Sequence, residues 1–540
     1  MLFNSLEFLI FLAIVYALYR VLPFRGQNWL LLIAGYVFYG WWDWRFLFLL
    51  IFSTTIDFWS GLVLDRGRLT RHQVAVPALF LTAAALLLLG CNMSELLGRI
   101  RGAGTGAPLL TPMMRYVLIG IPLFITGLTF AYRVLTSLPE ARRRKTCVGI
   151  SVTLQLLVLG FFKYFNFFID SLVASLNAAG FAAQASHFSI VLPVGISFYT
   201  FQSMSYAIDI YRRELKPTDR FFDFAVFVGF FPQLVAGPIE RARNLLPQMS
   251  QPRHITGDQI RRGCFLIMFG LFKKVAIADG MAMVADQAYA VPDATWGTIV
   301  AGTAAFAVQI YCDFSGYSDI ARGVAKLLGI ELIYNFNQPY FARSPRDFWQ
   351  RWHISLSTWL SDYLYKPLGG NRGSLAFTCR NLMLTMLLGG LWHGAAWNYV
   401  LWGLYHGTAL SVHRVIVSRR GPARDNSFLA FFKITGFGII TLYGWLLFRA
   451  RSFDQVVGYT KTLFSGRGGL EIDAGRPAVS AVAGVLLLII WEIAQYRSGG
   501  DARYYRKLHP SIVGLAIAFM LFFTLMGTSN EPAQFIYFQF

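Results

Sequence analysis

The chain has 540 residues, of which 56% are hydrophobic and 14% are charged, and its net charge is +20. This composition is too apolar for a soluble protein of that length, so we expect the chain to lie in a membrane. The positive charge does not indicate nucleic-acid binding, because the basic residues lie between apolar segments rather than on a soluble domain.

Apolar segments of about 20 residues recur along the chain, and each is long enough to cross a bilayer as a helix. We therefore predict an all-α polytopic membrane protein with about 11–14 transmembrane or re-entrant helices. The predicted spans lie near 3–22, 44–64, 74–92, 114–136, 146–169, 190–210, 263–285, 297–312, 381–416 (long enough for two), 428–448, 478–496 and 511–528. The shorter apolar pieces 28–40 and 223–238 contain Gly, and Phe231-Pro232 and Gly237-Pro238 lie in the second, so we expect re-entrant or broken helices there.

The basic residues between the spans can nearly all be placed on one side of the membrane, as the positive-inside rule expects. The N-terminus is then extracytoplasmic, and 171–188, which lacks Lys and Arg, is an external loop. Glu7 precedes the first basic residue, so we expect the first segment to remain as a span rather than to be cleaved. The five cysteines show no paired spacing, and we predict neither a disulfide framework nor a metal site.

Polar groups enter the apolar pattern at 311–319. Asp313, Ser315 and Asp319 end the apolar segment there, and polar groups at membrane depth need partners or water. Two interpretations stay open. The three residues line a functional cavity, or Asp313 or Ser315 caps a helix at the interface.

The next stretch, 346–365, has aromatic residues at helical spacing and is predicted to be an interfacial helix. His353 lies in its middle, and a neutral imidazole can donate and accept a proton near neutral pH. The alternative is a structural histidine. A loop with three glycines follows, from Lys366 to Gly373, where backbone N–H groups and Arg372 could hold an anion.

His393 lies in the span that begins near Asn381. It is about 12 residues, or roughly 18 Å at helical rise, beyond the basic-side entry, which places it near mid-membrane. An imidazole at that depth is costly unless it lines a wet cavity or pairs with a polar group. The alternative is a histidine hydrogen-bonded between helices, for which His406 on the returning span is a possible partner.

Several long strings of the sequence can be compared with known families: Leu192–Gln202 with Ser205–Arg212, Phe231–Pro238, Asp313–Asp319, Asn335–Tyr340, Phe348–Trp359, Gly369–Gly373 and Gly389–Gly394. They resemble the membrane-bound O-acyltransferase family, specifically its bacterial branch typified by alginate O-acetyltransferase. The resemblance covers nearly the whole chain.

The resemblance implies one membrane-embedded domain over 1–540, with helices around a central tunnel and a catalytic core at 188–410. His393 matches the mid-membrane histidine of the family, and His353 matches the second catalytic position. About two spans within 65–150 exceed what this branch leads us to expect. The residues expected to bind the donor or line the tunnel are Arg351, Trp352, Ser355, Asn371, Arg372, Trp392, Asp313, Ser315 and Asp319.

The residues and the resemblance predict the same reaction. An acyl thioester, expected to be acetyl-CoA, enters from the cytoplasm, where Lys366, Arg346, Arg351 and Arg372 could bind its phosphates. His393 then acts as general base on an acceptor hydroxyl, or the acyl group passes to a serine of a partner protein. No tightly bound cofactor is expected.

The resemblance further implies a location in the bacterial inner membrane, an exported polysaccharide such as alginate or cellulose, and a periplasmic or membrane-anchored hydrolase-like acyltransferase partner. Surrounding lipid is the remaining partner. D-alanyl transfer to teichoic acid and O-acetylation of peptidoglycan stay open as alternatives. In a different class, His393 and Asp209 could form the proton relay of a transporter, although we find no inverted repeat.

Overall fold

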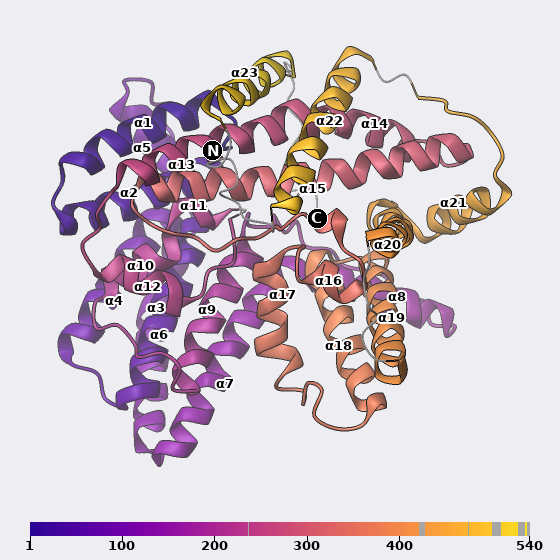
Figure 1. The fold of residues 1–540 in the computed structure, drawn as a ribbon. Coiled ribbons are helices and arrows are strands. Elements are labelled where there is room, and N and C mark those ends of the chain that lie inside the picture. Colours follow the sequence, from indigo (N-terminus) through magenta and orange to yellow (C-terminus); the bar gives the residue numbers. More distant parts are fainter. Residues whose placement is uncertain (236, 421–426, 473–474, 499–508, 528–534, 537–540) are drawn as a thin grey trace. The chain divides into compact units, whose positions relative to one another are not determined.

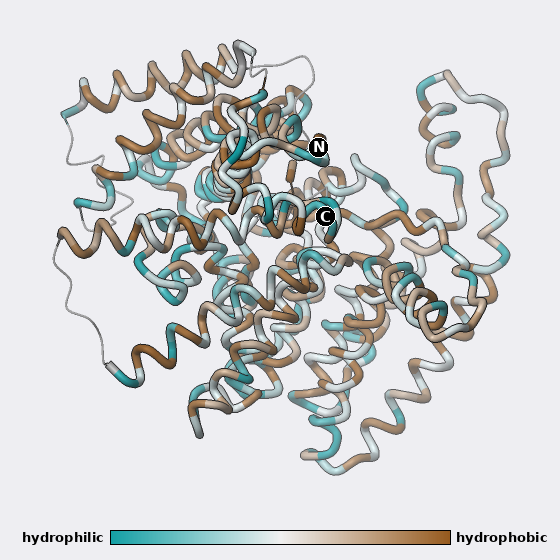
Figure 2. Tube along the Cα trace, turned by 90° about the vertical axis from the view of Figure 1, so that its right-hand side faces the viewer, coloured by the Kyte–Doolittle hydropathy of each residue, from teal (hydrophilic) through white to brown (hydrophobic). Residues whose placement is uncertain are grey.

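A computed structural model describes the chain except residues 236, 421–426, 473–474, 499–508, 528–534 and 537–540 (Figure 1). The described residues are mostly helical, and their one β-type pairing is an isolated bridge between Cys91 and Leu110. Hydrophobic stretches run along the helices, and hydrophilic residues mark many helix ends and turns (Figure 2). The predicted all-α class is confirmed.

Eight helical stretches of the described residues are long and apolar enough to cross a membrane. They agree with the prediction of a multi-pass membrane protein. The wider count of 11–14 includes re-entrant and shorter helices, which a length criterion does not test. The eight stretches are Phe24–Arg66, Arg71–Leu89, Met114–Ser137, Glu140–Ala178, Trp296–Leu327, Leu375–His393, Phe428–Arg449 and Ala478–Arg497.

The chain forms two compact units. The first comprises Met1–Val235, Ile239–Ile255 and Leu328–Glu331. Its helices are α1 (Leu6–Val21), α2 (Phe24–Asp43), η1 (Trp44–Phe46), α3 (Leu47–Arg66), α4 (Arg71–Ala84), η2 (Ala85–Leu89), α5 (Met93–Ile100), α6 (Met114–Ser137), α7 (Glu140–Leu159), η3 (Gly160–Tyr164), α8 (Phe165–Ala178), α9 (Ile196–Tyr211), α10 (Phe221–Gly229), α11 (Phe231–Leu234) and α12 (Ala242–Ser250).

Glycine contacts and helix breaks shape this unit. A Cβ on Gly35 of α2 would lie 2.0 Å from the Gly229 carbonyl oxygen of α10, so this close approach requires glycine. The break predicted within 223–238 is confirmed, because α10 ends at Gly229 and α11 begins at Phe231. The prediction of a broken helix within 28–40 was wrong, since α2 continues from Phe24 to Asp43. Helix α8 reaches Ala178, so the first half of the predicted loop 171–188 is helical.

The second unit comprises Ala236–Pro238, Thr256–Leu327 and Leu332–Phe540. Its helices are α13 (Gly257–Leu271), η4 (Phe272–Ala278), α14 (Asp279–Ala290), α15 (Trp296–Leu327), η5 (Pro339–Phe341), α16 (Pro345–Trp349), α17 (Ile354–Leu360), η6 (Ser361–Tyr365), α18 (Leu375–His393), α19 (Trp397–Arg420), α20 (Ser427–Arg449), α21 (Phe453–Ser465), α22 (Gly475–Arg497) and α23 (Pro510–Met526).

Two helix pairs organise this unit. α13 packs along α15, where a Cβ on Gly270 would lie 2.5 Å from the Gly316 carbonyl oxygen. α18 and α19 run side by side, and a Cβ on Gly390 would lie 2.2 Å from the Tyr399 carbonyl oxygen (Figure 1). Small residues therefore let these backbones touch, as is common between membrane helices. The predicted end of the span at 312 was wrong, because α15 continues to Leu327.

Candidate active site

The stretch predicted as one interfacial helix, 346–365, is broken in the middle. α16 ends at Trp349, α17 begins at Ile354, and His353 between them adopts a left-handed backbone with φ 42° and ψ 54°. Such a conformation is uncommon for a residue other than glycine and must be held by its surroundings. Here the Ile354 N–H donates to the Asn335 carbonyl oxygen at 2.9 Å. The prediction of one continuous helix was therefore wrong. The break places the His353 imidazole inside the second unit.

Asn335 fixes the orientation and tautomer of His353. The backbone N–H and the hydroxyl of Ser355 both donate to Asn335 Oδ1, at 3.2 and 2.9 Å, which identifies that atom as the oxygen. His353 Nδ1 lies 3.2 Å from the same oxygen. Since Oδ1 can only accept, Nδ1 must donate, and Nε2 is the basic nitrogen of the neutral ring. Asn335 donates in turn to Ser318 Oγ at 3.3 Å.

The His353 imidazole is fully buried, and it lies in the segment between two candidate spans. Phe314 of α15 packs edge-on against it, with ring centroids 4.7 Å apart. Burial disfavours the charged form and lowers the pKa of His353 to about 3. The ring is therefore neutral at physiological pH.

His393 is the last residue of α18, and the chain turns sharply after it. Gly394 has extended backbone angles, and a Cβ there would lie 2.1 Å from the Tyr399 ring, so the turn requires glycine. The His393 imidazole is packed among aromatic rings, with centroids 5.0 Å from Trp392 and 5.2 Å from Trp402. It lies 6.5 Å from the His353 ring. The two histidines singled out from the sequence are thus brought together.

His393 lines a cavity of about 410 Å³ within the second unit. This volume falls in the range of small-molecule sites. Arg346 of α16 and Tyr365 of η6 also line it, as does Gly389 of α18, and His353 does not. The other lining residues are Trp349, Gln350, Ile354, Leu356, Ser357, Thr358, Leu360, Ser361, Leu382, Thr385, Met386, Trp402 and Leu410.

The other expected donor-binding residues lie outside this lining. Arg351 forms an ion pair with Asp347 at 2.6 Å. Trp352 is buried and stacked on Phe348, with ring centroids 5.6 Å apart, so it belongs to the packed core. Trp392 contacts the rings of both histidines.

The loop after η6 is a glycine turn, as predicted. Gly369, Gly370 and Gly373 all have positive φ. Asn371 and Arg372 at its tip are exposed. Lys366 is exposed too and forms an ion pair with Asp362 at 2.5 Å. The structure thus leaves this turn at the surface of the second unit.

Asp313 lies within the 32-residue helix α15, so the capping interpretation was wrong. Its carboxylate pairs with Lys274 of η4, whose Nζ lies 3.0 Å from Asp313 Oδ1 and 2.8 Å from Asp279 Oδ1. The other oxygen, Oδ2, accepts the Ile536 N–H at 2.8 Å. The adjacent Phe535 packs on Tyr317, with ring centroids 4.0 Å apart. The buried charge of Lys274 is therefore matched by two buried carboxylates.

Ser315 and Asp319 line a second cavity, of about 380 Å³, together with Lys273. Lys273 Nζ lies 2.5 Å from Asp319 Oδ2 and 3.0 Å from Ser315 Oγ. Asn335 lines this cavity, and Ile354 lines both cavities. The second cavity therefore reaches the residue that orients His353.

Sequence reasoning missed three residues of the site. Lys273 and Lys274 lie in the predicted span 263–285, and two adjacent lysines in an apolar span could have indicated buried carboxylate partners. Asn335 was noted only as part of a motif. His406 does not pair with His393 but packs on Trp402, with ring centroids 4.7 Å apart.

The fold and these contacts describe a multi-pass membrane protein whose second unit holds a pair of buried histidines beside a cavity of small-molecule size. Residues 212–452 match the model of MBOAT, the membrane-bound O-acyltransferase family.

Three relatives extend the match. A probable alginate O-acetylase AlgI of Azotobacter vinelandii is 37% identical over 91% of this chain and 84% of the relative. Its counterpart from Pseudomonas aeruginosa is 38% identical over 86% of this chain and 75% of the relative. A peptidoglycan O-acetyltransferase of Helicobacter pylori is 36% identical over 64% of this chain and 71% of the relative. The chain belongs to the membrane-bound O-acyltransferase family and is an O-acyltransferase, which sets aside the transporter alternative.

Proposed function

We propose that this enzyme takes an acetyl group from a cytoplasmic thioester, acetyl-CoA, and delivers it across the bacterial inner membrane for O-acetylation of an exported polysaccharide such as alginate or cellulose. One observation carries the proposal: His393 lines a cavity of about 410 Å³ with a second imidazole 6.5 Å from its own. The similarity to alginate O-acetylases over most of the chain supports the acetyl group and the polysaccharide.

In the proposed reaction His393 is the general base. The acceptor hydroxyl loses its proton to the imidazole while its oxygen attacks the thioester carbonyl carbon. The C–S bond then breaks, and the thiolate takes the proton back from His393. The products are an ester and a free thiol, so atoms and charge balance.

We assign His353 a supporting role in this reaction, because it contacts the rings of His393 and Trp392 but does not line the cavity. Its neutral ring, oriented by Asn335, would stabilise the imidazolium formed on His393 through the basic Nε2.

The donor is proposed to enter where Arg346 lines the cavity, since its exposed guanidinium can bind a phosphate of the donor. Arg372 and Lys366 on the glycine turn would attract the donor from the cytoplasm rather than hold it in the cavity. This assignment places the N-terminus outside the membrane and residues 341–380 inside the cell. Labelling of a single cysteine at position 374 from the outside of intact cells would contradict it.

Two acceptors remain compatible with the reaction: a hydroxyl of the polymer, or a serine of a periplasmic or membrane-anchored hydrolase-like partner. We favour the partner. Proteoliposomes with labelled acetyl-CoA inside and polymer outside separate the two, because site-specific acetylation without a second protein would contradict the partner route.

The test of the catalytic assignment is His393→Ala. Loss of the general base should lower acetyl transfer by roughly 100-fold or more. Transfer of labelled acetyl is measured in membranes with matched amounts of protein. His187→Ala is the control, because that exposed histidine pairs with Asp170 and should leave transfer unchanged. Normal transfer by His393→Ala would overturn the assignment.

A further inference from the structure

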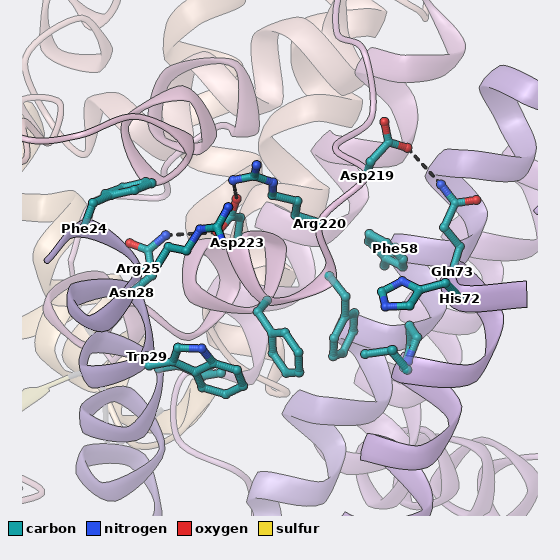
Figure 3. Close-up of a pocket in the computed structure, with 15 residues that line it drawn as sticks. Phe24, Arg25, Asn28, Trp29, Phe58, His72, Gln73, Asp219, Arg220 and Asp223 are labelled. Carbon is teal, nitrogen blue, oxygen red and sulfur yellow. Dashed lines mark hydrogen bonds and ion pairs between the residues drawn. The ribbon is translucent and has the colours of Figure 1, made fainter. Parts of the chain in front are cut away.

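The first unit contains a cavity of about 340 Å³ that acyl transfer does not use (Figure 3). It lies at one end of α2 and α4, beside the start of α10. Arg25 lies in the first turn of α2, and His72 lies in the first turn of α4. The lining residues are Phe24, Arg25, Asn28, Trp29, Leu32, Phe58, His72, Gln73, Val76, Pro77, Asp219, Arg220, Phe221, Phe222 and Asp223.

The lower part of this cavity is apolar and firmly packed. The Trp29 ring lies 4.3 Å from that of Phe222, and Phe58 packs edge-on against Phe221 at 5.4 Å. Leu32 and Val76 complete the lining. A ligand that lies here must therefore offer a hydrocarbon surface.

The carboxylates at the mouth already have partners. Asp219 forms an ion pair with Arg66 and accepts from Gln73 Nε2 at 2.9 Å. Asp223 accepts from Asn28 Nδ2 at 3.0 Å, and Arg220 lies 3.9 Å from it. Their negative charges are thus largely compensated within the unit.

Arg25 and Arg220 are the arginines of the lining, and only Asp223 is left to balance their charge because Asp219 pairs with Arg66. Arg25 and His72 are exposed and make no hydrogen bond or ion pair with another residue that the structure describes. Arg220 has further guanidinium N–H groups beyond its long contact with Asp223. The mouth can therefore accept an anion at its arginines, and Figure 3 shows Arg25 and Arg220 beside Asp223, with His72 apart from them beside Gln73.

We propose that this cavity binds an anionic glycerophospholipid of the surrounding membrane, with its phosphate at Arg25 and Arg220 and an acyl chain against Trp29 and Phe222. Arginine and tryptophan concentrate where helices leave a bilayer, which is the level of lipid headgroups. The apolar lining distinguishes a lipid from a free phosphate. The site is separate from the acyltransfer cavity and does not depend on the proposed reaction.

Native mass spectrometry of the purified full chain with added phosphatidylglycerol tests this site. The Arg25→Ala variant should bind one lipid roughly 5-fold more weakly. This side chain is exposed, so the variant should fold. Val76→Trp fills the apolar part of the cavity and keeps the arginines. It should weaken binding of the same lipid. Arg101→Ala, a substitution of an exposed arginine outside the cavity lining, is the control.

Three results would overturn the proposal. The first is unchanged retention of phosphatidylglycerol by both cavity variants. The second is equal retention of phosphatidylcholine, which has no net charge, by the unmodified protein. The third is binding of inorganic phosphate that depends on Arg25 while no lipid is retained.

Discussion

Helices α6 and α15 both satisfy the length and composition of a membrane span, yet they differ in almost everything else. In the most apolar window of α6, 6% of the residues are buried, and in that of α15, 72% are. Val117 is the one buried residue of α6. α15 instead presents Asp313, Ser315 and Asp319 to buried lysines.

The difference shows how apolar and polar helices divide their roles in this protein. α6 exposes large hydrophobic side chains such as Leu118, Leu123 and Phe130, as suits contact with lipid, which needs no specific partners. The polar groups of α15 must each be satisfied inside the protein, so their positions fix those of neighbouring residues. Through Phe314 and Ser318, α15 also supports the residues around His353.

The largest expected effect comes from Lys274→Met. It leaves the carboxylates of Asp279 and Asp313 without their shared cation, and breaking such a buried pair costs about 3–5 kcal/mol. We expect a sharp fall in the thermal midpoint in detergent. Arg133→Met, at an exposed position of α6, should change stability by less than about 0.5 kcal/mol. Equal effects of the two substitutions would remove the distinction between the helices.

A smaller effect is expected from adding a side chain to a glycine. Gly316→Leu on α15 places a Cβ 2.8 Å from the Gly270 carbonyl oxygen of α13, and such overpacking costs about 1–3 kcal/mol. Gly127→Leu on α6 meets no atom within 4 Å of the new Cβ and should be neutral. The thermal midpoints of the two glycine variants, measured side by side in detergent, test this difference. A destabilised Gly127→Leu would mean that α6 has a partner in the membrane.

The last prediction concerns acid stability. Because the pKa of His353 is about 3 in the folded protein and about 6.5 when unfolded, the unfolded state binds more protons between these values. Stability should therefore fall as pH decreases from about 6.5 toward about 3, by at most about 1.4 kcal/mol per pH unit. His353→Gln should show a shallower decline in thermal midpoint between about pH 7 and pH 5. His187→Ala should follow the unmodified protein, and parallel profiles for all three proteins would contradict this account.

The sequence predicted the helical class. It also singled out His353 and His393, which the structure brings together, because an imidazole in an apolar chain is conspicuous. It was insufficient for the break at His353, because the aromatic periodicity of Phe348, Trp352 and Trp359 continues across α16 and α17. The break depends on Asn335, which belongs to a separate segment. Likewise, the glycine turn was predicted, but its place outside the cavity lining follows from packing that local patterns do not contain. The single-domain boundaries and the central tunnel stay predictions.

The hydrogen bond between Asp313 and Ile536 joins residues 223 positions apart. At a synthesis rate of 5–20 residues per second, roughly 10–45 s separate the emergence of the two partners from the ribosome. During that interval α15 must enter the membrane with only Lys274 to balance this carboxylate, while the rings of Phe314 and Tyr317 still lack Phe535. The newly inserted enzyme therefore passes through a period in which its spans are in place but the packing behind His353 is unfinished. Membrane proteases and insertion chaperones have that long to recognise it.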